Sequence, residues 1–239
     1  MSERLLALNG RGYDIRPARQ DDLPSMLILE KIAWGTQGAS AEMLESRIRV
    51  FPAGQIVALT EREVVGYLSF QRVDALCADT RSWGQLTDEG TIRRSHMPEG
   101  EYLFGVNLSV SPGHPGVGLQ LQLAGWRMGI EHRVRGCFLG SRVPGYSMVS
   151  DRYSIEKWVH GKNSKSKDKM VRYYQGAGFR VVALVPNYFP DPESLNYGVL
   201  MYCPNIFYRL PCSRLWSLVV HRYGFTVLRL IGFIDLSVA

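Results

Sequence analysis

The sequence has few of the features that mark secreted, disulfide-bonded or metal-binding proteins. Its four cysteines form no C-x-x-C pair, and its five histidines are scattered singly along the chain. These absences argue against a structural zinc site and indicate a reducing compartment. No apolar stretch near the N-terminus is long enough for a signal peptide. We therefore expect a cytoplasmic protein that binds no metal ion.

Long runs of basic residues are also absent, although the formal net charge is +6. No segment combines basic and aromatic residues as nucleic-acid-binding modules do, so no nucleic-acid partner is expected. The densest basic stretch, 162–169, lies among small polar residues and is expected to be a solvated loop. The excess positive charge modestly favours a polyanionic ligand or an acidic partner. With 239 residues, 46% of them hydrophobic, the chain can form one large domain with insertions or an appendage.

The most informative stretch lies near the middle of the chain. Apolar residues alternate from Val106 to Val110, which predicts a strand with one buried face. Three glycines follow within six residues, and apolar residues at helical spacing then run from Leu119 to Ile130. A strand, a glycine loop and a helix start bring several unpaired N–H groups together, and such groups suit a phosphate or pyrophosphate. The alternative is a glycine loop that only turns the chain.

Two common phosphate-binding motifs do not fit this stretch. A P-loop requires Gly-Lys-Ser/Thr at the end of the loop, whereas Gly118 is followed by leucine and glutamine. A dinucleotide-binding fingerprint opens a βαβ unit near the start of a doubly wound domain, and this loop lies near mid-chain. Both motifs are therefore excluded.

The stretch from Leu108 to Gly118 resembles the acyl-CoA-binding motif of the GNAT acetyltransferase superfamily. In that motif an L-x-V-x-P strand precedes Arg/Gln-x-x-Gly-x-Gly/Ala and a helix. Gly116 and Gly118 match it, whereas Gly113 replaces the leading Arg or Gln and removes one side chain but not the backbone donors. The resemblance implies acetyl-CoA or another acyl-CoA as co-substrate. The cofactor-binding residues that it implies are Leu108, Val110, Gly113, His114, Gly116, Val117, Gly118 and Leu119.

A second segment, 173–185, resembles the superfamily's Y-x-x-x-G-F block, in which a helix ends at glycine and a strand begins. Tyr174 lies four residues before Gly178, where many members have a tyrosine that protonates the departing CoA thiolate. A phenol with a pKa near ~10 is mostly protonated at neutral pH and suits this role. The resemblance therefore implies that Tyr174 is the general acid. The alternative is an aromatic residue on the packing face of a helix.

The order of the predicted elements agrees with the resemblance. Residues 13–73 read as β-α-α-β-β, and a central strand at 101–111, the loop and helix, and a strand at 136–142 follow. A helix at Tyr174 and two last strands, at 180–186 and 197–203, complete the order. The resemblance implies an α/β (α+β) protein of the GNAT fold. Its sheet is mixed and mostly antiparallel, splays between the two central strands and is flanked by helices. We assign residues 1–204 to this domain.

Two insertions, 74–100 and 143–167, interrupt the order, and the first is polar and aperiodic; a flap on the substrate side is one explanation. Segments near 140–146 and 187–193 resemble a GNAT subgroup that includes domains fused to carbon–nitrogen hydrolases and GNAT-like loading domains of polyketide assembly lines. In the loading domains a tryptophan, a Thr/Ser, a histidine and an arginine are associated with malonyl decarboxylation and acetyl transfer. Trp34 and Ser141 fall near the first two positions, and Tyr174 and Phe189 stand at the other two. Because the histidine and the arginine are absent from these two positions, plain acyl transfer is favoured over decarboxylation.

The sequence defines the acceptor of the acyl group less well. An amine acceptor must lose a proton, usually to a carboxylate acting through water, and the candidate bases are Glu101, Glu30 and His160. Trp34 is either a substrate platform or ordinary packing at a helix end. The expected function is transfer of an acetyl or other short acyl group from CoA to an amine. The alternatives are a loading module (an S-acetyltransferase, with or without malonyl-CoA decarboxylase activity) acting on an acyl carrier protein, and a silent scaffold that binds acyl-CoA or a carrier protein.

The chain changes character after residue 204. Residues 205–239 contain four arginines and one acidic residue, a net charge of +3, together with many large apolar residues. Arg222 and Arg229 interrupt the apolar positions, so no run reaches the ~20 residues of a membrane span. We expect an apolar, basic C-terminal extension that docks on the core, on a partner subunit or on an anionic membrane surface, with docking on protein favoured.

Overall fold

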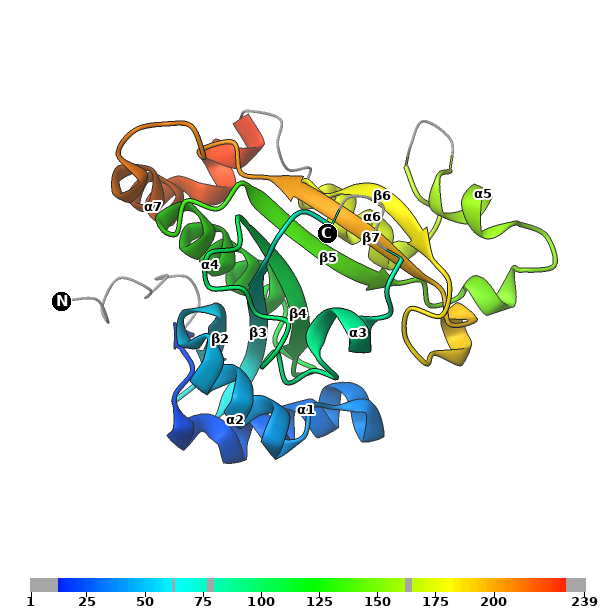
Figure 1. Cartoon of the computed structure of the whole chain (residues 1–239), viewed down its shortest axis with the longest axis horizontal. Coiled ribbons are helices and arrows are strands. Elements are labelled where there is room, and N and C mark those ends of the chain that lie inside the picture. Colours follow the sequence, from blue (N-terminus) through cyan, green and yellow to red (C-terminus); the bar gives the residue numbers. More distant parts are fainter. Residues whose placement is uncertain (1–12, 62, 77–79, 162–164, 231–239) are drawn as a thin grey trace.

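The computed structural model describes residues 13–61, 63–76, 80–161 and 165–230, with side chains described in the last helix up to Gly224. The predictions for the N-terminal dozen residues, for the start of the basic stretch at 162–164 and for residues 231–239 lie outside the described residues. Figure 1 shows one sheet with helices on both of its faces.

Seven strands form the sheet in the order β1-β2-β3-β4-β5-β7-β6. The strands are β1 (Asp14–Pro17), β2 (Gln55–Leu59), β3 (Val64–Val73), β4 (Tyr102–Val110), β5 (Gly136–Arg142), β6 (Arg180–Val185) and β7 (Gly198–Pro204). The α-helices are α1 (Leu23–Trp34), α2 (Ala41–Val50), α3 (Trp83–Thr87), α4 (Val117–Glu131), α5 (Ile155–Val159), α6 (Lys169–Gly176) and α7 (Ser213–Leu230). Short 3-10 turns connect several of them, at Gln20–Asp22, Gly35–Gln37, Pro52–Gly54, Tyr146–Met148 and Pro192–Ser194.

The sheet is mixed, as the resemblance implies. β4 and β5 are parallel, and every other neighbouring pair is antiparallel. The two parallel strands pair only over Leu103–Gly105 and Cys137–Leu139 and are unpaired beyond that point. The predicted splay between the two central strands is therefore confirmed.

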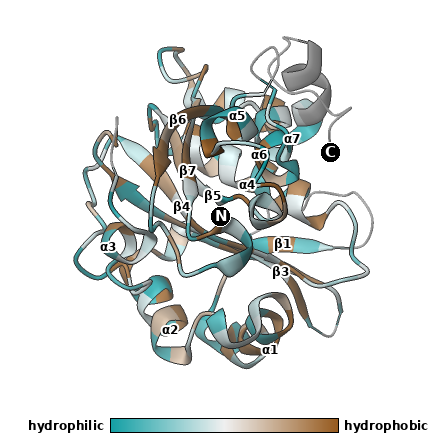
Figure 2. Ribbon diagram, turned by 90° about the vertical axis from the view of Figure 1, so that its right-hand side faces the viewer, coloured by the Kyte–Doolittle hydropathy of each residue, from teal (hydrophilic) through white to brown (hydrophobic). Residues whose placement is uncertain are grey.

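Helices cover the two faces of the sheet in separate groups (Figure 2). Along β2 the side chains alternate, as a strand requires: Val57 packs with α1 and α2, whereas Ile56 and Ala58 belong to the larger core that includes α4. A third cluster packs α5 and α6 against β5, β6 and β7. The sheet therefore separates an α1–α2 face from an α4 face.

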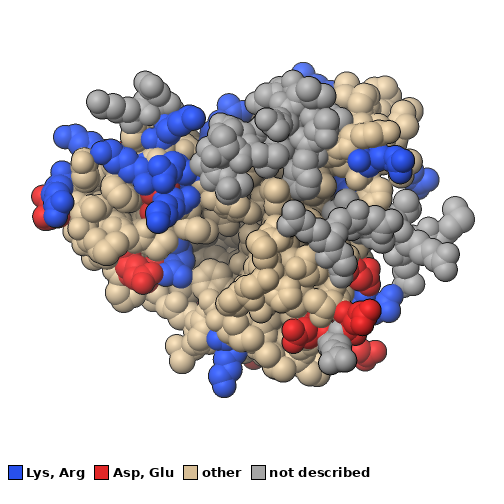
Figure 3. Space-filling view, turned by 180° about the vertical axis from the view of Figure 1, so that it is seen from behind, with Lys and Arg blue, Asp and Glu red and all other residues tan. Residues whose placement is uncertain are grey.

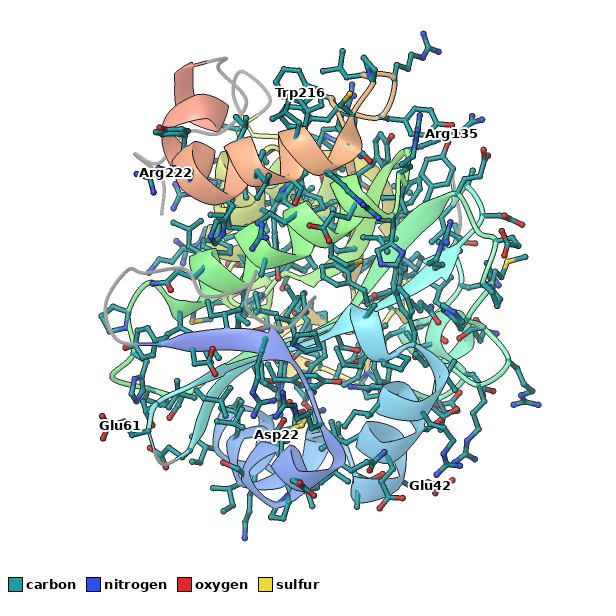
Figure 4. All side chains as sticks on the ribbon, turned by 90° about the vertical axis from the view of Figure 1, so that its left-hand side faces the viewer. Asp22, Glu42, Glu61, Arg135, Trp216 and Arg222 are labelled. Atoms are coloured by element: carbon teal, nitrogen blue, oxygen red, sulfur yellow. The ribbon has the colours of Figure 1, made fainter. Side chains whose placement is uncertain are left out.

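The N-terminal elements follow the signals in the sequence. Ser40 caps α2 by accepting a hydrogen bond from the Met43 N–H at 3.3 Å. Arg16 donates to both carboxylate oxygens of Asp22, at 2.7 and 2.8 Å, and so ties β1 to the start of α1 (Figure 4). The aperiodic insertion 74–100 contains α3, which Ser82 and Gln85 cap reciprocally.

The described part of the C-terminal extension packs on the core of its own chain. α7 lies along α4, with Trp216 and Arg222 at different points of its length (Figure 4). Val220 is fully buried, and Ser217 donates a hydrogen bond to Glu131 of α4. Three surfaces were expected for docking: the core, a partner subunit or an anionic membrane. In the structure the described part of the extension packs on the core. Leu215, Leu218 and Tyr223 stay exposed on α7.

Candidate active site

A cleft of about 440 Å³ opens where β4 and β5 separate. Val106 is an extra residue in β4, because Gly105 and Asn107 face consecutive residues of β3. Such a bulge bends and twists a strand, which accounts for the divergence of β4 from β5 just after their last pair. The Val106 carbonyl accepts a hydrogen bond from the Trp83 indole N–H at 3.0 Å. Trp83 of α3 thereby forms one wall of the cleft.

The glycine loop ends at the start of α4, beside this cleft. Gly113 and Gly116 both have φ +86°, a left-handed conformation that side chains disfavour. This backbone requirement explains why glycine stands at position 113 in place of Arg or Gln. Among the described residues no side chain caps the start of α4, and the Val117 N–H makes only a long hydrogen bond, 3.4 Å, to the His114 carbonyl. The start of the helix can therefore present N–H groups to an anion.

The predicted cofactor residues divide into two groups. Leu108, Val110 and Gly118 line the cleft. The other five, Gly113, His114, Gly116, Val117 and Leu119, are not part of its lining. Val117 is buried in the core, and the His114 ring faces Tyr13, whose hydroxyl lies 3.1 Å from Nδ1. The loop thus contributes backbone and turn geometry more than side-chain contacts.

Tyr174 projects from α6 into the cleft. Its ring packs edge-on against Tyr173 and Phe179, and its hydroxyl has no hydrogen-bond partner among the described residues. Burial, together with the neighbouring Tyr173 and Cys137, raises the pKa of Tyr174 above its usual value of 10.0. The phenol is therefore protonated at neutral pH, as a general acid must be.

Trp34 belongs to a buried polar network that joins α1 to β4. Its indole N–H donates to Ser109 Oγ at 2.7 Å, and Ser109 in turn donates to Glu30 Oε1 at 2.6 Å. Asn107 donates to the same carboxylate oxygen at 2.7 Å, and the Ala39 N–H donates to Oε2 at 2.9 Å. These bonds fix Glu30, which is only 2% exposed and lines the cleft.

The structure separates the three candidate bases. Glu30 lies in the cleft, whereas Glu101 is exposed at the far end of β4 and pairs with Arg135 at 2.8 Å. His160 is exposed after α5 and is not part of the cleft lining. Glu30 is therefore the candidate that shares a cavity with Tyr174.

Ser141 lies in the cleft wall on β5, next to a paired cation. Its hydroxyl donates to the Arg142 carbonyl at 2.8 Å. The Arg142 guanidinium lies 5.6 Å from the centre of the Trp34 ring and binds both carboxylate oxygens of Asp191, at 2.7 and 2.6 Å. Phe189, at the position expected for an arginine, lines the cleft and packs edge-on against Trp83.

Sequence reasoning did not assign many of the cleft residues to the site, among them Tyr188, Arg47, Trp83 and Cys137. Tyr188 is 3% exposed, and its hydroxyl lies in the space that a side chain at Gly140 would need, only 1.8 Å from an ideal Cβ. No partner for this hydroxyl exists among the described residues, and burial raises its pKa. Gly198 is also in close contact with Tyr188, whose Cγ lies 2.3 Å from an ideal Cβ there, so the glycines at 140 and 198 were the sequence features that could have indicated this close approach.

Basic side chains gather on the surface over α5 and α6, on the back face of the molecule (Figure 3). Exposed members of this group include Lys157, Lys165 and Lys169. α6 also supplies Met170, Tyr173 and Tyr174 to the cleft wall. The positive charge therefore lies beside one side of the cleft, where it favours an anionic ligand.

Among the described residues, no group of His, Cys, Asp and Glu side chains is arranged to hold a metal ion. Within the same residues, no helix combines the length and the apolar character that crossing a bilayer requires.

Comparison with known proteins identifies relatives and similar structures. No family model matches the chain. The chain is 31% identical to the uncharacterized N-acetyltransferase YkwB of Bacillus subtilis over 174 residues, which are 71% of this chain and 76% of YkwB. It is also 26% identical to the probable hydrolase YhcX of Bacillus subtilis over 219 residues, 87% of this chain but only 42% of YhcX. The chain thus spans less than half of YhcX.

Two solved structures share the fold over most of the chain. The loading GNATL domain of CurA from Lyngbya majuscula has a TM-score of 0.71 at 23% identity, covering 81% of this chain and 98% of that domain. The GphF GNAT-like decarboxylase, solved with isobutyryl-CoA, has a TM-score of 0.69 at 24% identity. The match covers 80% of this chain and 99% of the decarboxylase chain.

Proposed function

This chain belongs to the GNAT family of acyltransferases, and on that premise we propose that it transfers an acetyl or other short acyl group from CoA to an amine. The observation that supports this most is the cleft at the splayed strands, which has an uncapped helix start beside one end and both Tyr174 and Glu30 in its walls. Similarity to YkwB, an N-acetyltransferase by name, supports the amine as acceptor.

Acyl-CoA would bind along the open edges of β4 and β5. The first N–H groups of α4 would hold its pyrophosphate, and the basic residues over α6 favour its phosphates. Gly118 has no side chain to obstruct this path, since the nearest atoms to an ideal Cβ there, the Tyr173 hydroxyl and Val110 Cγ2, are 3.5 Å away. The β4 backbone beyond Gly105 has no β5 partner and can pair with the amide groups of the ligand.

The chemistry needs one acid and one base. The amine nitrogen attacks the thioester carbonyl carbon, the new C–N bond forms, and the C–S bond breaks. Tyr174 would give its phenolic proton to the leaving thiolate and regain one from solvent. The proton of the amine would pass to Glu30, directly or through water, and Trp34 would shield the reacting groups from bulk water.

A covalent acyl-enzyme intermediate is disfavoured. Cys137 lines the cleft, but burial raises the pKa of its thiol to about 12. At neutral pH almost no thiolate, the nucleophilic form, is present. Direct transfer to the acceptor is therefore the mechanism that the site supports.

A second candidate function is loading of a carrier protein. The fold shared with CurA and the presence of Trp34 and Ser141 in one cleft favour it. Phe189 at the arginine position and the pairing of Arg142 with Asp191 argue against strong binding of a malonyl carboxylate there. Direct amine acylation is therefore our first choice, and a silent scaffold is the remaining alternative.

The test is calorimetric titration of the purified protein with acetyl-CoA and malonyl-CoA, followed by mass spectrometry of mixtures with an amine panel. We expect saturable acetyl-CoA binding and an acceptor-dependent mass increase of one acetyl group. Conversion of malonyl-CoA to acetyl-CoA, or acetylation only of carrier-protein thiols, would support the loading function instead. Binding without turnover on any acceptor would support the scaffold.

A further inference from the structure

Arg47 is a buried cation in the wall of the cleft. It projects from α2, is 1% exposed, and donates from Nε to the Gly90 carbonyl at 2.7 Å. Its Nη1 atom is buried and has no hydrogen-bond partner in the described part of the chain. Arg47 also makes no ion pair with any carboxylate of the described residues. The guanidinium is therefore buried with neutral partners, the Gly90 carbonyl and the Tyr67 hydroxyl, and without a counter-charge among the described residues.

Such an arrangement is unfavourable unless something pairs with the charge. A buried ion without a counter-charge is unfavourable, because it has lost its hydration and no opposite charge replaces it. A guanidinium presents N–H groups in a fork that matches a carboxylate. Arg142, the other arginine in the cleft lining, already has both oxygens of Asp191 as partners. Arg47 is thus the cleft arginine with a donor left for a ligand.

Arg47 is closely packed by apolar side chains, and two of them, Trp83 and Met43, line the cleft with it. Around the position of an ideal Cβ at Gly90, Arg47 Nη2 lies at 3.0 Å, the Trp83 ring at 2.8 Å and the Met43 sulfur at 3.2 Å. The charges of Arg47 and Glu30 both act on the buried hydroxyl of Tyr67. Arg47 and Glu30 both line the cleft, and they have opposite charges and form no ion pair with each other.

We propose that the cleft binds an amine acceptor that also has a carboxylate, as in an amino acid. Arg47 would hold the carboxylate, and Glu30 would receive the amino group at the reacting end. The inference rests on the proposed acyl transfer to an amine. The carboxylate is assigned to the acceptor because Arg47 and Glu30 belong to α2 and α1, on the sheet face opposite α4, whose start is the proposed CoA site (Figure 2).

The experiment compares acceptors that differ only in the carboxylate. The native protein is assayed with acetyl-CoA and with pairs of amino acids and their carboxamides. For the amino acid that is acylated fastest, we expect kcat/KM to be at least tenfold higher than for its carboxamide. Equal values for acids and amides would overturn the proposal, and no variant is needed for this comparison.

Variants then assign the preference to one residue. Arg47→Met should abolish the preference for acids, Arg47→Lys should retain part of it, and the matched control Arg49→Met, an exposed position on the same helix, should leave it unchanged. Acetyl-CoA affinity and the melting temperature report whether each variant is folded. An unchanged preference in a folded Arg47→Met variant would assign the carboxylate to another residue and refute the role of Arg47.

Two further results separate this proposal from the proposed function. If no amine is acylated, the proposed function fails, and the carboxylate site is judged by calorimetric binding of N-acetyl amino acids and their amides to the native protein and Arg47→Met. A carboxylate site is upheld if Arg47→Met binds the N-acetyl amino acids tenfold more weakly than the native protein does, while the two proteins bind the amides equally well. If Arg47→Met weakens malonyl-CoA binding but not acetyl-CoA binding, the carboxylate belongs to the acyl donor and the acceptor assignment is wrong.

Discussion

Replacing Tyr174 with phenylalanine removes one hydroxyl and no described hydrogen bond. The ring contacts with Tyr173 and Phe179 are kept, so the melting temperature should change by no more than about 1–2 °C. Loss of a general acid costs roughly 10²–10⁴ in rate, which is about 3–5 kcal/mol in activation free energy. We expect kcat to fall by that factor, while the Kd of acetyl-CoA stays within about twofold, since the proton is transferred only in the reaction.

The assay is steady-state release of CoA thiol with a fixed acceptor, combined with calorimetric binding of acetyl-CoA. Tyr153→Phe is the matched control, because Tyr153 packs on Trp158 and is not part of the cleft lining. The raised pKa of Tyr174 further predicts that its ionisation causes no loss of kcat between pH 7 and pH 10. A kcat for Tyr174→Phe within threefold of the native value would remove Tyr174 from the mechanism and direct attention to Tyr188, whose pKa the nearby Tyr174 also raises.

Three further predictions concern the cofactor path, acid stability and the cleft thiol. Gly118→Leu should raise the Kd of acetyl-CoA at least tenfold in calorimetry without changing the melting temperature, whereas Gly118→Ala, whose Cβ would meet its nearest atoms at 3.5 Å, should bind normally. Burial raises the pKa of Asp191, but hydrogen bonds from Arg142 and Ser194 more than offset this and lower it below 3.8, so this carboxylate stabilises the fold above pH 3.8 and the stability is lost as the pH falls through the lowered pKa. Arg142→Met should therefore cost about 1.5–3 kcal/mol at pH 7 by urea unfolding, because it removes the charged partner of Asp191 but leaves the hydrogen bonds from Ser194 and the Glu193 N–H, and a loss under 1 kcal/mol would contradict this. Cys137→Ser should keep kcat within about threefold, because a thiol with a pKa of about 12 is not the nucleophile; loss of activity in a folded variant would revive an acyl-enzyme intermediate.

Much of the fold could be predicted because the signals are local. The alternation from Val106 to Val110, the glycines and the apolar helix that follows predicted β4, the loop and α4, although α4 starts two residues earlier than expected, at Val117. The resemblance to acyltransferases is confirmed by the similarity to YkwB, and the expected likeness to loading domains and to a hydrolase-associated subgroup is matched by the fold shared with CurA and by the sequence similarity to part of YhcX.

The site was only partly predictable because it is assembled from segments that are distant in sequence. Trp34, Ser141 and Tyr174 were expected together on the strength of a resemblance, and they do line one cleft. Arg47 could not be found, since an arginine in an amphipathic helix normally faces solvent and nothing local shows that it is buried. Tyr188 can reach the cleft because Gly140 of β5 and Gly198 of β7 leave space for its side chain.

The short pairing of β4 with β5 has a consequence for hydrogen exchange. A gap within the sheet leaves backbone amides near its centre without a strand partner, so the free protein should exchange these amides faster than those of the fully paired β3–β4 ladder. A bound acyl-CoA that pairs with them would join the two halves of the sheet and slow their exchange. It would also raise the unfolding free energy by about 2.7 kcal/mol at a ligand concentration one hundred times the Kd. The co-substrate would then be a structural element of the folded state as well as a reactant.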